Sequence, residues 1–148
     1  MHQIMTINPL RAAARALTGS TYAVLGFEAA REPGVRVEMA GSTLAAVRKV
    51  APLPADDELI VRANGAVQAV AGVTLALGLF PRLSTMALAA SLVPTTFAGH
   101  AFWEIEDEAA AKMQRVQFQK NLAMLGGLVF AFLDAQHASA KRRSRPEA

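Results

Sequence analysis

The sequence predicts an all-α integral membrane protein, a four-helix bundle with short interfacial helices in its two outer loops. Hydrophobic residues make up 53% of the 148 residues and charged residues only 18%, which is an apolar balance for a soluble domain. The charges gather between four apolar stretches, and the two central stretches contain none. Soluble bundles are built from amphipathic helices, whereas these central stretches are apolar on all sides. We therefore expect four helices that cross a bilayer.

The apolar stretches run over residues 12–30, 63–80, 83–103 and 121–135. A helix needs about 20 apolar residues to cross the hydrocarbon core. The second and third stretches meet this length, and the first and fourth meet it if their charged ends reach the headgroups. Residues 1–138 then form a single four-span membrane domain. Residues 139–148 form a basic tail that we expect to be disordered.

The two long connections on the outer side are each predicted to contain a helix. In the first, Ala40, Leu44, Val47 and Ala51 recur at helical spacing, which is typical of a short interfacial helix. The second, residues 104–120, opens with acidic residues and closes with basic ones. This order matches the helix dipole, so a helix continuous with the fourth span is expected.

The distribution of basic residues predicts the orientation. Four of them, Lys141, Arg142, Arg143 and Arg145, directly follow the fourth apolar stretch, as the positive-inside rule requires of a cytoplasmic helix end. Both termini should therefore be cytoplasmic and the protein should lie in the plasma membrane. The basic residues do not alternate with aromatic ones on one face, so we expect no nucleic-acid partner. No small-residue cleavage site follows an apolar run near the start, so no removable signal peptide is expected.

The residue types limit the redox chemistry of the chain. It contains no cysteine, which excludes disulfides, iron–sulfur clusters and thiol relays. His100 lies near the outer end of the third stretch and His137 near the inner end of the fourth, most of a bilayer apart, so they cannot share a haem or a metal ion. His2 lies outside the spans. We expect the chain to hold no metal and no cofactor, and we leave a bound quinone as an alternative.

Polar side chains of several spans are predicted to meet near the outer surface, and these are the candidate lipid- or quinone-binding residues: Glu28, Asn64, Gln68, His100, Lys120 and Asn121. Polar groups in a membrane generally face each other or a cavity. We expect an ion pair between Glu28 and Lys120, and a hydrogen bond from His100 to Asn121 or Gln68. The cluster can be interpreted as a device that joins the helices, as a headgroup pocket for a lipid or quinone, or as a proton relay.

An inner salt bridge is also predicted, between Arg15 (or Arg11), Arg82 and Asp134. On the second stretch Gly65, Ala69, Gly72 and Ala76 form a face of small residues, which allows a neighbouring helix to approach closely. Trp103 lies where an interfacial anchor is expected.

Four local patterns give the chain a resemblance to a known family. The first stretch has Gly26 followed by Ala-Ala-Arg-Glu-Pro at 29–33, and the second has Gly72, Gly78 and the Pro81-Arg82 turn. The third ends in His-Ala-Phe-Trp at 100–103, and the fourth begins with Phe-Gln-Lys-Asn-Leu-Ala-Met-Leu-Gly-Gly-Leu at 118–128. In these patterns the chain resembles the DoxX family of small four-span membrane proteins, and particularly its actinobacterial branch. The family often has a lysine shortly after the first glycine; Glu28 and Ala29 stand there in this chain, so no role of that lysine is carried over.

The resemblance implies a membrane subunit, since the family takes its name from a subunit of a quinol-linked thiosulfate-oxidising complex, and other members are linked to redox-stress assemblies. We expect a non-catalytic subunit or scaffold of a larger redox-linked or envelope lipid-transport complex, with membrane lipids and other membrane protein subunits as partners. The alternative is a quinol-interacting oxidoreductase subunit. The lack of cysteine, of paired histidines and of a carboxylate dyad favours the scaffold. A small transporter is disfavoured because the spans show no discontinuous-helix repeats.

Overall fold

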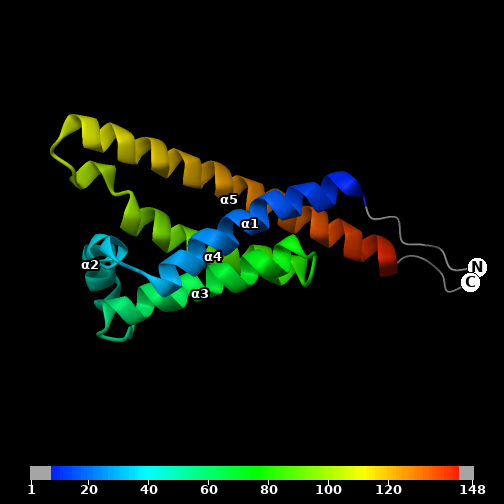
Figure 1. The fold of residues 1–148 in the computed structure, drawn as a ribbon, viewed down its shortest axis with the longest axis horizontal. Helices are drawn as coiled ribbons and strands as arrows, with labels where there is room; N and C mark the ends of the chain where they lie inside the picture. Colours follow the sequence, from blue (N-terminus) through cyan, green and yellow to red (C-terminus); the bar gives the residue numbers. More distant parts are fainter. Residues whose placement is uncertain (1–7, 144–148) are drawn as a thin grey trace, which may run out of the picture.

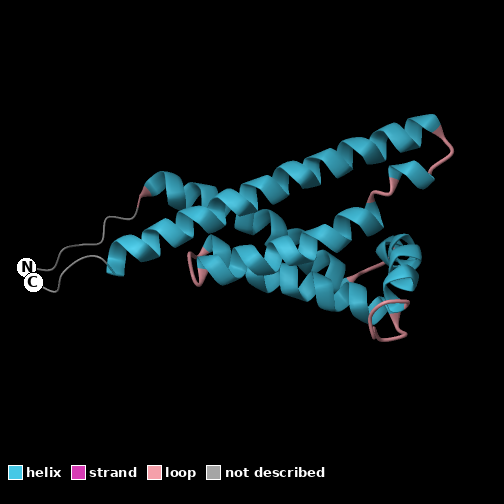
Figure 2. Cartoon of the chain, turned by 180° about the vertical axis from the view of Figure 1, so that it is seen from behind, coloured by secondary structure: helices cyan, strands magenta, loops and turns pink. Residues whose placement is uncertain are grey.

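The computed structural model describes residues 8–143, and over this range the chain is helical apart from short loops (Figure 2). The elements are α1 (Pro9–Arg31), α2 (Val35–Arg48), α3 (Asp57–Ala76), α4 (Pro81–Gly99), a 3₁₀ helix η1 (Phe102–Glu104) and α5 (Glu108–Arg143). The prediction of an all-α fold is confirmed. The helices α1, α3, α4 and α5 contain most of the four apolar stretches, and α2 is the helix expected in the first long connection. As expected, the helix of the second long connection continues into the fourth stretch, within α5.

The helices begin and end at capping side chains and at residues with positive φ, and these positions cannot be read from the length of an apolar stretch. The side chain of Asp56 accepts a hydrogen bond from the Leu59 amide at 3.0 Å, so α3 starts before its apolar stretch. The predicted stretch 63–80 is too long, because Gly78 (φ +71°) and Phe80 (φ +46°) adopt left-handed conformations that end α3. The stretch 83–103 likewise ends early, at Gly99, and η1 follows it.

The basic tail was predicted to begin at residue 139. The helix α5 instead extends through Arg143, so the first part of that segment is helical. Residues 144–148 lie outside the described range, as does His2.

Two helices of the described chain are long and apolar enough to cross a membrane: α3, and the part of α5 from Glu108 to Ala138. The helix α5 has 36 residues, a length of about 54 Å at 1.5 Å per residue. It is therefore much longer than the hydrocarbon core of a bilayer, about 30 Å.

The helices α1 and α3 lie side by side (Figure 1), and four glycines line their contact. Gly19 lies against Gly72, and Gly26 lies against Gly65, with the two helices antiparallel. A Cβ placed on Gly19 would lie 2.5 Å from the Gly72 carbonyl oxygen, so the two backbones are in direct contact. The small-residue face predicted on the second stretch is thereby confirmed as a packing surface, and its partner is α1.

The helices α2, α4 and α5 pack around this pair. The helix α4 packs against α3 on one side and against α5 on the other, while α2 lies across α3 and α4 at one end (Figure 1). The buried core draws on all four long helices, at Tyr22, Ala71, Leu75, Leu88, Leu92 and Leu128. Many large apolar side chains point outward instead, among them Phe27, Val70 and Phe130, as expected where lipid rather than water surrounds the helices.

The two ends of the helical region lie at the same end of the molecule. An Arg11 guanidinium nitrogen is 2.8 Å from an Asp134 carboxylate oxygen, which joins the first turns of α1 to the later part of α5. The turn between α3 and α4 lies at this end as well, and α2 with η1 lies at the other (Figure 1).

Candidate functional site

A network of hydrogen-bonded polar side chains joins α3 to α4. The Ser91 hydroxyl donates to Asn64 Oδ1 at 2.7 Å and accepts from Gln68 Nε2 at 2.9 Å. The Thr95 hydroxyl accepts from Asn64 Nδ2 at 3.0 Å and donates to the Ser91 carbonyl at 2.8 Å. Gln68 and Ser91 are buried. The structure therefore brings together two of the predicted site residues, Asn64 and Gln68, and uses them to hold two helices in register.

The partners of these amides in the network are Ser91 and Thr95, which were not among the predicted site residues. Their signal is the spacing of two hydroxyls four residues apart, which places both on one face of a helix. That spacing becomes informative only when the facing helix is known to present amides.

We predict that the network contributes measurably to stability. Gln68→Leu and Ser91→Ala should each lower the free energy of unfolding in detergent by about 1 kcal/mol, because each leaves buried partners unpaired. The double variant should lose less than the sum of the two. Thr21→Ala is the matched control, since the Thr21 hydroxyl bonds only to the Leu17 carbonyl of its own helix. Additive losses in calorimetry or thermal unfolding would contradict the coupling.

Polar contacts between α4 and α5 involve two other predicted residues. Asn121 Nδ2 donates to the buried Thr96 hydroxyl at 3.1 Å, and His100 Nδ1 lies 2.7 Å from Gln114 Oε1. The predicted bond from His100 to Asn121 or Gln68 is thus wrong. Because α5 runs antiparallel to α4, the residue that faces His100 comes earlier in α5 than Asn121.

The predicted ion pair between Glu28 and Lys120 is also wrong. Glu28 Oε2 lies 3.8 Å from a guanidinium nitrogen of Arg36, at the start of α2. Lys120 is exposed on α5. The helices α1 and α5 meet at the opposite end of the molecule, at Arg11 and Asp134. Glu28 and Lys120 were expected at the same depth in the membrane, but they lie on helices that are not neighbours at that depth.

The predicted inner salt bridge is corrected as well. Asp134 pairs with Arg11, the residue left as an alternative, and not with Arg15. Arg82 lies over the Phe132 ring, with 5.9 Å between the guanidinium carbon and the ring centroid. Arg15 packs its guanidinium against Gly78 in the α3–α4 turn, and its Nε is buried without a hydrogen-bond partner. Arg11 lies one turn closer than Arg15 to the start of α1, where α5 passes.

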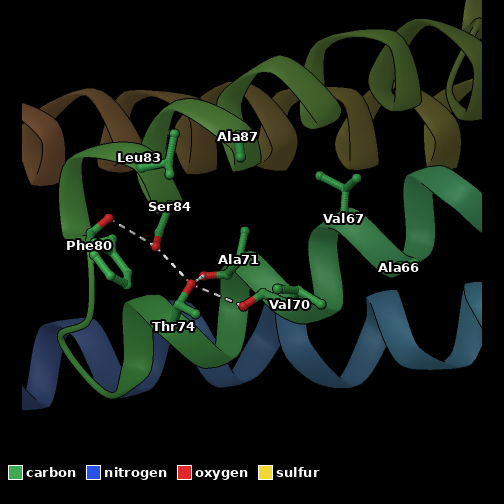
Figure 3. A pocket seen from close by; sticks show the side chains of 9 residues that line it. All are labelled: Ala66, Val67, Val70, Ala71, Thr74, Phe80, Leu83, Ser84 and Ala87. Atoms are coloured by element: carbon green, nitrogen blue, oxygen red, sulfur yellow. Dashed lines mark hydrogen bonds between the residues drawn. The ribbon is translucent and has the colours of Figure 1, made fainter.

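An apolar groove of about 440 Å³ opens between α3 and α4 near the turn that joins them (Figure 3). It is lined by Ala66, Val67, Val70, Ala71, Thr74, Phe80, Leu83, Ser84 and Ala87. The hydroxyls of Thr74 and Ser84 are 2.8 Å apart, so one donates to the other, and the accepting hydroxyl donates to a main-chain carbonyl. With these hydroxyls satisfied, the walls present chiefly apolar atoms and suit an alkyl chain. The predicted site residues do not line this groove.

A polar pocket of about 350 Å³ lies where α1 meets α2, and its walls are Phe27, Glu28, Arg31, Glu32 and Arg36. Glu28 is the one predicted site residue in it. The ion pairs of its walls are long: 3.8 Å for Glu28 with Arg36 and 3.6 Å for Arg31 with Glu32. The six predicted residues are thus distributed over this pocket, the α3–α4 network, the α4–α5 contact and the exposed surface.

Two further arginines organise the same end of the molecule. Arg62 donates to the main-chain carbonyls of Ala30 and Arg31 at 2.7 and 2.8 Å and pairs with Glu58 at 2.8 Å. Arg48 donates to the Pro54 carbonyl at 2.6 Å and pairs with Asp57. The last carbonyls of a helix require donors from elsewhere, and Arg62 supplies them for α1.

Four aromatic rings fasten η1 to α4 and α5. Phe102 contacts Trp103 and Phe118 with ring centroids 5.1 and 5.7 Å apart, and Phe97 contacts Trp103 and Phe118 at 6.2 and 5.7 Å. Trp103 remains about half exposed, as an interfacial anchor would.

A family model for DoxX matches residues 10–101, which is more than half of the chain. The chain belongs to the DoxX family. The DoxX match covers α1 to α4 and ends before α5, so the run at 118–128 lies beyond it. No curated protein and no solved structure matches this DoxX chain. DoxX membership and the two apolar helices together indicate a membrane protein.

Proposed function

We propose that this DoxX chain is a four-span subunit of the plasma membrane that acts as a non-catalytic scaffold for other membrane proteins, in a redox-linked or lipid-transport assembly. The observation that carries the four spans is the direction of the two helices that have the length and composition of a membrane span. Both α3 and α5 run from the end that holds α2 and η1 toward the end that holds the termini of the helical region (Figure 1).

This parallel arrangement requires a third crossing. If α3 and α5 both span the bilayer in the same direction, the chain must return between them. The segment between them contains α4, η1 and short loops. With 19 residues, α4 is about 28 Å long, close to the thickness of the hydrocarbon core.

The close contact of α1 with α3 supports the fourth crossing. The glycine contacts at Gly19 and Gly26 are two helical turns apart, so α1 follows α3 through most of its length. Its charged residues lie toward the two ends, where Arg15 and Glu28 can reach the headgroup regions.

A structural role is supported by the use of the polar side chains. Three of the predicted side chains form hydrogen bonds with hydroxyls of α4: Asn64, Gln68 and Asn121. Each of these bonds joins two helices. The outer surface of α5 meanwhile presents apolar side chains, with Phe130 77% exposed. Such a surface suits contact with lipid or with the apolar helices of a partner subunit.

The orientation is testable with fusion reporters. We expect a reporter at the C-terminus, or in the α3–α4 turn, to be active in the cytoplasm, and one in the α2–α3 loop to be active outside. The full chain should also resist alkaline carbonate extraction. A C-terminal reporter active only outside the cytoplasm would contradict the orientation, and release by carbonate would contradict the membrane-spanning role.

The scaffold role is tested separately. Purification of the full chain in mild detergent should yield a stoichiometric membrane partner, and the visible spectrum should lack a Soret band. A stoichiometric quinone bound to the isolated chain would instead favour a quinol-interacting oxidoreductase subunit.

A further inference from the structure

We propose that the polar pocket between α1 and α2 binds the headgroup of a phosphatidylethanolamine in the outer leaflet. The inference rests on the proposed membrane-spanning function, and it gives one site a defined ligand.

The walls carry two carboxylates and two guanidiniums, from Glu28, Glu32, Arg31 and Arg36. A phosphoethanolamine headgroup has the complementary pair of charges. Its phosphate accepts hydrogen bonds in the planar fork geometry that a guanidinium offers. Its primary ammonium donates up to three hydrogen bonds, which carboxylates accept.

The charges of the pocket do not satisfy one another. Strong charge-assisted hydrogen bonds have lengths of about 2.7–2.9 Å. The pairs Arg11–Asp134 and Arg62–Glu58 reach 2.8 Å. In the pocket the corresponding distances are 3.6 and 3.8 Å. Arg36 also donates to the Glu32 carbonyl at 3.4 Å. The carboxylates and guanidiniums therefore retain hydrogen-bonding capacity beside a pocket of about 350 Å³.

The backbone below these side chains is fixed. Arg62 binds the carbonyls of Ala30 and Arg31, and the Glu32 amide donates to the Glu28 carbonyl at 2.8 Å. Pro33, which follows, is buried. A fixed frame lowers the entropy lost when a ligand is bound.

The position of the pocket identifies a lipid as the source of the headgroup. In the proposed orientation, the end of α1 lies at the outer headgroup region. Phe27 is 59% exposed and precedes Arg31 by one turn, on the side of the hydrocarbon core. It can contact the acyl chains of a lipid whose headgroup lies among the four charges.

The test is the retention of lipids by the purified full chain, measured by native mass spectrometry. The chain is equilibrated with equal amounts of phosphatidylethanolamine, phosphatidylcholine and phosphatidylglycerol that share the same acyl chains. We expect about three- to fivefold preference for phosphatidylethanolamine over phosphatidylcholine, whose quaternary ammonium has no N–H to donate, on the scale of one exposed ion pair.

The variants separate the two halves of the site. Glu28→Gln should abolish the preference over phosphatidylcholine, because it removes the acceptor of the ammonium. Arg36→Gln should lower the retention of phosphatidylethanolamine and of phosphatidylcholine to the same extent, because both lipids have the phosphate. Glu38→Gln, an exposed carboxylate on α2 outside the pocket, should change neither. Equal retention of the two lipids by the unmodified chain, or a preference that survives Glu28→Gln, would overturn the proposal.

A competition experiment checks the source of the headgroup. Soluble phosphoethanolamine at millimolar concentration should not displace the lipid, since it lacks the acyl chains that contact Phe27; displacement would assign the pocket to a soluble zwitterion and overturn the lipid assignment. Carbonate extraction and the reporters test the membrane-spanning function independently, so a chain that spans the membrane without lipid preference would refute this inference alone.

Discussion

Replacing Gly72 by valine should separate α1 from α3 and cause a larger loss of stability than any other substitution proposed for this chain. A Cβ at this position would lie 2.5 Å from the Ala23 amide nitrogen and 2.6 Å from the Gly19 carbonyl oxygen. Both are backbone atoms of a packed helix, so neither can turn aside as the end of a side chain would. We expect a loss of at least about 3 kcal/mol in the free energy of unfolding, the upper range for overpacking. Thermal unfolding in detergent measures it.

The matched control for this prediction lies in the same chain. Gly127 also occupies a long helix, but a Cβ there would meet no heavy atom within 4 Å. Gly127→Val should leave stability unchanged to within about 0.5 kcal/mol, as surface substitutions generally do. Equal losses in the two variants would show that α1 and α3 are not in backbone contact.

Replacing Arg62 by alanine should have the second largest effect. The change removes two charge-assisted donors from the carbonyls of Ala30 and Arg31 and the partner of Glu58. We expect a loss of about 2–3 kcal/mol, the range for hydrogen bonds that involve charged groups. The last turn of α1 should also exchange its amide hydrogens faster, and hydrogen–deuterium exchange with mass spectrometry can localise this effect.

Two variants define the cause. Arg62→Lys keeps the charge but cannot reach two carbonyls with a planar fork, so it should recover only part of the stability. Arg115→Ala removes an exposed arginine of α5 and should have little effect. Unaltered exchange in the last turn of α1 in Arg62→Ala would show that this cap is not required.

The long helices of this chain could be predicted because apolar stretches of 15 to 21 residues stand between groups of charged residues. The helix in the first connection was predicted because Ala40, Leu44 and Val47 repeat at helical spacing. The exact ends were not predictable from apolar length, since they depend on single residues. The Asp56 side chain caps α3 at its start, and the positive φ of Gly78 ends it.

The contacts of the candidate site were predicted less well, because depth in a membrane does not determine which helices are neighbours. Glu28 and Lys120 were expected at a similar depth, yet they lie on helices that meet only at the other end of the molecule. Glu28 pairs instead with Arg36, which is only eight residues away in the sequence. The heptad of Gly19 and Gly26 on α1, matched by Gly65 and Gly72 on α3, was the sequence signal for the correct neighbour.

The glycine contact between α1 and α3 also has a consequence for how the chain is made. Synthesis delivers α1 to the membrane first, although it carries Arg15 and Glu28 and is not among the helices apolar enough to cross alone. The surface that secures it belongs to α3, which emerges 26 residues after α1 ends, counted from Arg31 to Asp57. If α1 spans the membrane as we propose, the two helices form a single unit of insertion, and contact with α3 holds α1 in the bilayer.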